Sequence, residues 1–184
     1  VFVDGGRGIV REAVIGLDVG TTVAKAVLFD VLGSNGSDQS ISGTELYLAE
    51  RAYSLRTPQP GWVELGPDDI WQAVVAVLQD VASWAAPRIR IRAVALAAQG
   101  GTLIPCRADG TPTYRAITWM DERSHDLVER WRAEGVVEKV RRISGWSPQP
   151  GLPLPSIGWL RQARPEILAA TDRFLSVSGF LAQR

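Results

Sequence analysis

The string DVGTT at residues 18–22 constrains the fold of this chain most, because it separates two apolar runs. Residues 13–17 lead into the string and residues 23–31 lead out of it, and both runs are typical of buried strands. A glycine lets the backbone approach a phosphate closely, while threonines offer hydroxyl and N–H donors. The carboxylate of Asp18 is a ligand of the type that Mg²⁺ prefers. We therefore predict a hairpin tip that holds phosphate and metal; the alternative is a tight turn capped by its Asp and Thr side chains.

Length, composition and charge are those of an ordinary globular chain. With 184 residues, of which 46% are hydrophobic and 22% charged, the chain can form a domain with a core. Its 20 basic residues balance 20 acidic ones, so no net field attracts nucleic acid or an anionic membrane. Every apolar run is broken before it reaches the length that spans a bilayer. We therefore expect neither a nucleic-acid nor a membrane partner.

Single residues and the chain ends indicate the compartment and the extent of the domain. Cys106 is the one cysteine, which excludes an internal disulfide and fits a reducing, cytoplasmic compartment; its apolar run predicts a buried side chain. His125 lies in a charged helical stretch with no second histidine, so we expect it at the surface. Residues 1–12 lack the long apolar region of a secretory signal and are expected to form a flexible leader. The chain opens on Val1 and stops within a helical pattern at residues 180–184, which predicts a fragment.

The first half of the chain predicts strands around one long helix. Strands are expected over residues 14–18, 23–31 and 45–54. A polar, glycine-rich loop is expected over residues 33–43. Pro67 favours a helix start, and helical spacing continues to residue 84. The expected buried stripe of this helix consists of Ile70, Val74, Val77, Leu78, Val81 and Trp84. Residues 91–98 are almost wholly apolar, which predicts a central strand.

The second half predicts shorter elements. A turn at residues 108–110 separates strands expected over residues 102–106 and 114–119. Prolines are excluded from the interior of ladders and helices, so residues 147–155 are expected to be extended. The remaining pattern predicts helices over residues 122–133, 136–143, 157–164 and 165–171, a strand over 174–177 and a helix start at 179–184. Together with the first half, this order predicts an α/β layer with a mixed sheet.

Four stretches, taken in order, carry a resemblance to a known family. They are residues 15–30, 60–71, 95–101 and 116–124, which read IGLDVGTTVAKAVLFD, PGWVELGPDDIW, ALAAQGG and AITWMDERS. In these stretches the chain resembles the N-terminal part of the first domain of FGGY carbohydrate kinases, in the manner of xylulokinases and gluconate kinases. The resemblance implies that residues 13–184 form an incomplete ribonuclease H-like (actin-like ATPase) α/β domain with a mixed sheet. The second domain of the family, which closes over the nucleotide, is then absent from the chain.

The resemblance implies a phosphate site at the first of these stretches. Asp18 would organise Mg²⁺ and the transferring phosphoryl group. Gly20, Thr21 and Thr22 would bind the phosphates of ATP, with the charge of Lys25 nearby. ATP and Mg²⁺ are thus the implied cofactors, and in such a transfer the protein mainly positions groups and stabilises charge. Lys25 has the alternative of a solvent-facing strand residue.

The later stretches imply a sugar site. Its implied residues are Gln99, Gly100, Gly101, Trp119, Asp121 and Arg123. Gln99 would offer an amide that both donates and accepts, and Trp119 would form an apolar wall against the carbon skeleton. Asp121 and Arg123 would order the surrounding loop or contact hydroxyls. The alternative interpretation leaves Trp119 in the core, with Asp121 and Arg123 as a helix cap and its surface partner.

Three features depart from the pattern of the family. Many members carry Met-His or a similar polar pair where this chain has Gly100 and Gly101, which leaves the sugar open and favours a roomier pocket. Ser156 stands where related chains often carry a lysine. The catalytic aspartate, which accepts the proton of the sugar hydroxyl, is expected beyond Arg184. The chain therefore holds no catalytic residue and is expected to be inactive by itself.

These stretches predict a sugar kinase, in which the full-length protein transfers a phosphoryl group from ATP to a hydroxyl of a ketopentose, polyol or aldonate. One alternative is a non-catalytic sugar-binding or interaction module derived from a kinase. Another actin-like ATPase would share the DVGTT string but does not explain residues 62–64 or 119–123. Trp62 and Glu64 are expected to organise the fold rather than to catalyse. The implied partner is a small-molecule sugar or polyol, and a homodimer of the full-length protein is compatible with the resemblance.

Overall fold

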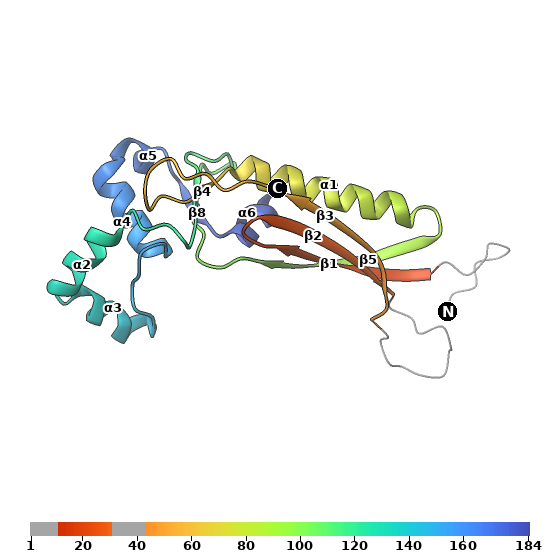
Figure 1. Cartoon of the computed structure of the whole chain (residues 1–184), viewed down its shortest axis with the longest axis horizontal. Helices are drawn as coiled ribbons and strands as arrows, with labels where there is room; N and C mark the ends of the chain where they lie inside the picture. Colours follow the sequence, from red (N-terminus) through yellow and green to blue (C-terminus); the bar gives the residue numbers. More distant parts are fainter. Residues whose placement is uncertain (1–10, 31–42) are drawn as a thin grey trace. The chain divides into compact units, whose positions relative to one another are not determined.

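The computed structural model describes residues 11–30 and 43–184, which form two compact units (Figure 1). Unit 1 comprises the residues up to Tyr53 together with Ile70–Ala98, and unit 2 comprises Ser54–Asp69 together with Gln99–Arg184. The expected leader over residues 1–12 lies outside the described residues, apart from its last two residues, which begin β1 (Arg11–Val19). The expected loop over residues 33–43 also lies outside them, apart from its last residue.

Unit 1 is built on a four-stranded mixed sheet. β1, β2 (Val23–Asp30) and β3 (Glu45–Ala52) follow one another antiparallel, and β5 (Ile89–Ala98) runs parallel to β1, in the order β3-β2-β1-β5. This confirms the expected mixed sheet and the hairpin that joins the first two strands. Every second side chain of β1 and β2 enters the core, because successive side chains of a strand point to opposite faces.

The prediction that residues 91–98 form a central strand is wrong for the sheet of the described residues. β5 lies at the end of the strand order, beside β1. Its Val94 and Leu96 are 51% and 38% exposed. A continuous apolar run indicates that both faces of a strand suit apolar partners, but it does not specify which segment supplies those partners.

α1 (Pro67–Ala85) supplies the helical layer of unit 1 from Ile70 onward, and Figure 1 shows it running along the sheet. Its buried stripe comprises Ile70, Val74, Val77 and Val81, with Leu78 partly buried. Trp84 departs from the expected stripe because it is exposed. In the last turn of the helix its ring stacks on Tyr47 of β3, with the ring centroids 5.1 Å apart, instead of entering the core.

Unit 2 contains two short antiparallel ribbons and a set of helices. β4 (Glu64–Leu65) pairs with β7 (Ala116–Ile117), and β6 (Ile104–Cys106) pairs with β8 (Arg173–Leu175). The helices are α2 (His125–Ala133), α3 (Val136–Ser144), α4 (Pro153–Ala163), α5 (Pro165–Ala169) and α6 (Val177–Gln183). Leu103, Ile117 and Leu160 form a buried cluster, against which Tyr114 and Trp159 pack. The cluster joins the ribbon of β7 to α4.

The prediction that residues 147–155 are extended is wrong at its end. α4 begins at Pro153 and includes Pro155 in its first turn. A proline has no N–H to donate, and the first turn of a helix has no use for one, so prolines are tolerated there. Residues 147–149 lie outside any helix or turn, as expected, whereas residues 150–152 form a turn in which the Leu152 N–H donates to the Gln149 carbonyl over 3.2 Å.

Two expectations for single residues are confirmed. Cys106 is a buried free cysteine, and burial raises the pKa of its thiol. His125 is exposed. Among residues 11–30 and 43–184, no helix combines the length and the apolar character that a bilayer crossing requires.

Candidate functional site

The first candidate site is the tip of the β1–β2 hairpin in unit 1. In register, Asp18 lies opposite Lys25. The Gly20 N–H donates to the Val23 carbonyl over 2.9 Å, which closes the turn. Asp18 and Thr22 are exposed. The tip is therefore a tight turn that also leaves a carboxylate and a hydroxyl accessible to a ligand.

Tyr53, directly after β3, holds this tip from outside the hairpin. Its hydroxyl donates to the Gly20 carbonyl over 2.5 Å, and its backbone N–H donates to the Thr22 carbonyl over 2.9 Å. Tyr53 is buried, and burial together with the charge of Asp18 raises its pKa to about 12. The hydroxyl therefore stays protonated and keeps donating. Sequence alone did not single out Tyr53, because it lies 33 positions from Gly20.

Lys25 lies beside the tip and forms an ion pair with Glu50. The two residues lie opposite each other in register, and their ion pair measures 2.6 Å. The hydrogen bond and the charge of Glu50 raise the pKa of Lys25, with a smaller contribution from Asp18. Since Asp18, Lys25 and Glu50 are cross-strand neighbours, they form a row of alternating charge across three strands. The ammonium group of Lys25 thus lies on the strand that leaves the tip, and the Glu50 carboxylate fixes its position.

The carboxylate of Asp18 is a ligand that suits Mg²⁺. Among the residues that the structure describes, no three His, Cys, Asp or Glu side chains gather as a metal site. Mg²⁺ commonly takes one or two carboxylates and completes its shell with water and substrate phosphates. An exposed carboxylate beside two threonines therefore fits an ion that arrives with a nucleotide.

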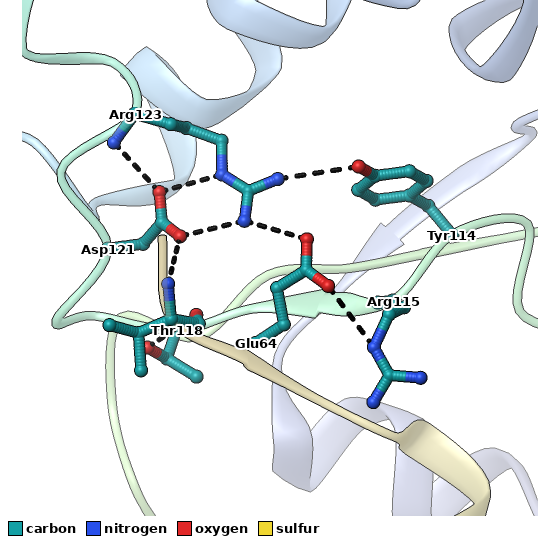
Figure 2. Close-up of polar contacts among 7 residues, drawn as sticks. Glu64, Tyr114, Arg115, Thr118, Asp121 and Arg123 are labelled. Carbon is teal, nitrogen blue, oxygen red and sulfur yellow. Dashed lines mark hydrogen bonds and ion pairs between the residues drawn. The ribbon is translucent and has the colours of Figure 1, made fainter. Parts of the chain in front are cut away.

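The second candidate site, in unit 2, is centred on the buried Arg123 (Figure 2). Its side chain is 1% exposed, and its guanidinium donates to both oxygens of Asp121 and to Glu64 over 2.7–2.8 Å. The same group lies 3.9 Å from the ring centre of Trp62 and 5.0 Å from that of Trp159. Burial opposes the charge, but the hydrogen bonds to Asp121 and Glu64 outweigh it and raise the pKa of Arg123. Arg123 is thus a fixed cation inside the fold.

Asp121 connects this cation to two backbone segments. Its carboxylate accepts from the Val63 N–H over 2.6 Å and from the Arg123 N–H over 2.9 Å. Thr118 adds two bonds to the Val63 carbonyl, one from its N–H over 3.1 Å and one from its hydroxyl over 2.9 Å. Two of the four stretches that carry the family resemblance are therefore joined into one structure, as Figure 2 shows.

Glu64 and Arg115 complete the charge balance of this network. Glu64 is buried; one of its oxygens accepts from Arg123, and the other lies 3.2 Å from Nε of Arg115. Two guanidinium groups therefore face the two carboxylates of Glu64 and Asp121. Because removal of one member leaves an unpaired buried charge, the network acts as a unit. Glu64 and Trp62 thus organise the fold, the role that their sequence context predicts.

Trp119 is 50% exposed, whereas the side chains of Asp121 and Arg123 are buried. The alternative that places it in the core therefore does not describe this structure. Gly101 lies against Trp119, and two residues before it Gln99 accepts a hydrogen bond from the Thr102 hydroxyl over 3.1 Å. Unit 2 thus contains an exposed indole, which offers an apolar face, and an amide, which can both donate and accept.

The expected site residues are distributed over both units. Unit 1 holds Asp18, Gly20, Thr21, Thr22 and Lys25, and unit 2 holds Gln99, Gly100, Gly101, Trp119, Asp121 and Arg123. The side chains of Asp121 and Arg123 are each 1% exposed, which favours a role in ordering the loop over contact with hydroxyls. Sequence alone singled out neither Arg115 nor Trp159, because each acts through contacts with distant segments.

Known proteins resemble this chain over most of its length. Residues 13–184 match the model of the FGGY family of carbohydrate kinases, N-terminal domain. The chain is 34% identical over 140 residues to a glycerol kinase from Burkholderia pseudomallei. This alignment covers 73% of the chain and 25% of the relative. It is 35% identical over 161 residues to a glycerol kinase from Gloeobacter violaceus, in an alignment that covers 87% of the chain and 30% of that relative. The chain thus spans between a quarter and a third of the length of these relatives.

Solved structures share the fold. A gluconate kinase and a xylulose kinase, both from Lactobacillus acidophilus, each match with a TM-score of 0.82 at 24% identity. The matches cover 93% and 92% of this chain and 32% of each of the two kinases. With the mixed sheet, this likeness confirms the ribonuclease H-like (actin-like ATPase) fold. Because the family match extends over residues 13–184, the chain belongs to the FGGY family of carbohydrate kinases.

Proposed function

We propose that the full-length protein transfers the γ-phosphoryl group of ATP to a hydroxyl of a small sugar or polyol. The observation that carries this proposal is the open hairpin tip in a domain of this family, where Asp18 and Thr22 are exposed and Tyr53 holds the turn. Similar proteins named as glycerol, gluconate and xylulose kinases support the reaction class and differ in the substrate.

The residues of the tip suit the handling of phosphate. Asp18 would hold Mg²⁺, which neutralises charge on the phosphoryl oxygens when it is bound. The threonine hydroxyls and the N–H groups of the turn would donate to phosphate oxygens. Lys25, braced by Glu50, would add positive charge beside them. Tyr53 would keep the turn in one conformation, so that little reorganisation accompanies the transfer.

For the acceptor we propose a ketopentose, a polyol or an aldonate. The half-exposed indole of Trp119 offers a wall for the carbon skeleton, and the Gln99 amide can donate to one hydroxyl and accept from another. A Cβ placed at Gly100 would meet no atom within 4 Å, which supports a roomy site. Asp121 and Arg123 would act by holding the loop that carries Trp119.

The proton of the acceptor hydroxyl needs a base, and we propose that an aspartate downstream of Arg184 accepts it, as the resemblance implies. Loss of a general base lowers the rate by about 10²–10⁴-fold. The 184-residue chain by itself is therefore expected to turn over at background. Because the buried, free Cys106 fits a reducing compartment, we place the full-length protein in the cytoplasm.

An ADP-release assay of the full-length protein, with a panel that includes glycerol, xylulose and gluconate, tests this proposal. We expect Mg²⁺-dependent turnover of at least one member. Asp18→Asn is expected to lower kcat by about 10²-fold or more, since charge stabilisation dominates such transfers. Glu45→Gln, at an exposed carboxylate of β3, is the matched control and leaves kcat unchanged. Full activity of Asp18→Asn, or no ADP above a blank with every member, overturns the proposal.

A further inference from the structure

We propose that Gly101 and Gly151 are positioning residues that hold the backbone of Trp119 and thereby fix where its indole stands. The claim that the indole contacts the substrate rests on the proposed function. The positions of Gly101, Gly151 and Trp119 relative to one another lie within unit 2 alone. Trp119 is 50% exposed. Both glycines lie so close to it that an added Cβ would collide, Gly101 with the Trp119 Cβ and Gly151 with the Trp119 carbonyl group.

Gly101 lies against Trp119 from the loop that follows β5. Its φ of +77° belongs to the left-handed region that favours glycine. A Cβ at this position would lie 2.8 Å from the Trp119 Cβ and 3.7 Å from Cδ2 of Leu152. Because nonbonded carbon atoms pack about 3.5–4.0 Å apart, a side chain here displaces either Trp119 or the loop itself.

Gly151 meets the same residue from the segment that precedes α4. Its φ is +78°, and a Cβ there would collide with the Trp119 carbonyl oxygen and lie 3.0 Å from the Asp121 carbonyl oxygen. The opposing backbone is held in place, because the Asp121 N–H donates to the Thr118 carbonyl over 3.0 Å. The Asp121 carboxylate is in turn part of the buried Arg123 network. A side chain at Gly151 therefore shifts Trp119 or breaks the contact between the two segments.

Two other glycines show that this contact is specific. Gly145 has the same left-handed φ of +77°, yet a Cβ there would meet nothing within 4 Å. Gly100, the neighbour of Gly101, also opens on empty space and lies outside the left-handed region. Gly145→Ala thus reports the effect of backbone strain alone, and Gly100→Ala reports the effect of an added methyl group in the same loop.

We call Gly101 and Gly151 together the clamp. Fluorine NMR of the full-length protein labelled with fluorotryptophan tests directly whether the clamp positions Trp119. The resonance of Trp119 is the one that Trp119→Phe removes. Gly101→Ala and Gly151→Ala are expected to shift this resonance and to leave the other tryptophan resonances in place, whereas Gly145→Ala and Gly100→Ala leave it unmoved. Should Gly151→Ala not fold, Gly101→Ala decides, because its contact is with a side-chain atom. An unmoved resonance in the clamp variants, or an equal shift in Gly145→Ala, overturns the proposal.

Steady-state kinetics connect the clamp to the substrate. Gly101→Ala and Gly151→Ala are expected to raise KM for the sugar, with a loss of about 10²-fold in kcat/KM, because a displacement on the order of 1 Å has that effect. KM for ATP stays unchanged, and Gly145→Ala, whose added methyl group meets no atom within 4 Å, keeps both constants. Absence of turnover by the wild type refutes the proposed function. In that case the fluorine spectra alone test whether the clamp positions Trp119. Turnover with an unchanged sugar KM in both clamp variants overturns the role of the clamp.

Discussion

At the scale of single residues, the hairpin tip combines an exposed carboxylate with a buried support. The DVGTT string predicts the turn, since the signals for it lie within a few positions of one another. Tyr53 has no such signal, because a tyrosine after a strand is unremarkable until the fold brings its hydroxyl to the Gly20 carbonyl. Local chemistry therefore predicted the turn, and the three-dimensional fold shows what keeps it in place.

Tyr53→Phe is expected to loosen the tip while keeping the buried ring. The variant removes the donor to the Gly20 carbonyl, and loss of such a bond lowers the free energy of unfolding by about 1 kcal/mol. KM for ATP is expected to rise in the full-length protein. Urea unfolding and ATP titration measure the two effects. Tyr47→Phe, which keeps its ring stacked on Trp84, is the matched control, and equal behaviour of the two variants contradicts the role of Tyr53.

The raised pKa of Tyr53 also predicts a pH dependence. The group titrates near 12 in the folded protein and near 10 when unfolded. Because the folded state binds this proton more tightly, its contribution to stability is complete below a pH of about 10 and is lost as the pH rises toward about 12. The free energy of unfolding is therefore expected to fall more steeply over this window in the wild type than in Tyr53→Phe. Urea titrations at a series of pH values check the difference, and parallel curves refute it.

At the scale of elements, periodicity predicted the parts that local physics decides. The long helix was predicted over residues 67–84 and spans Pro67–Ala85, because both its start signal and its apolar spacing lie inside it. The place of β5 in the sheet was not predictable, since composition does not identify a strand's neighbours. The Arg123 network joins residues up to 59 positions apart, so no window of sequence contains both partners.

Arg123→Ala is expected to lower the free energy of unfolding by about 3–5 kcal/mol, because it leaves Asp121 and Glu64 as buried carboxylates without their shared partner. Arg123→Lys recovers only part of the loss, since an ammonium cannot reproduce the planar fork or its stacking on the indoles. Arg141→Ala, which breaks an exposed ion pair with Glu138 on α3, leaves the unfolding midpoint unchanged. Thermal and urea unfolding compare the three variants, and wild-type stability of Arg123→Ala rules out the network's structural role.

At the scale of the whole molecule, β5 leaves apolar surface uncovered among the described residues. Val94 and Leu96 are exposed in a strand at the end of the sheet, a feature typical of association sites. The 184-residue chain is therefore expected to associate as its concentration rises. Sedimentation velocity measures this, and Val94→Lys is expected to reduce it. Ala82→Lys, which adds the same charge at an exposed site of α1, does not. Association that persists in Val94→Lys assigns the contact to another surface.

The empty space beside Gly100 has a consequence for how proteins of this kind change their preferences. A substituent there meets no atom within 4 Å, while the very next residue is pressed against Trp119. A side chain introduced at Gly100 therefore finds room in the loop, whereas one introduced at Gly101 meets Trp119. In the acceptor site that we propose, the two adjacent glycines thus differ in the substitutions they tolerate: Gly100 has room for new side chains that alter the acceptor, and Gly101 has none.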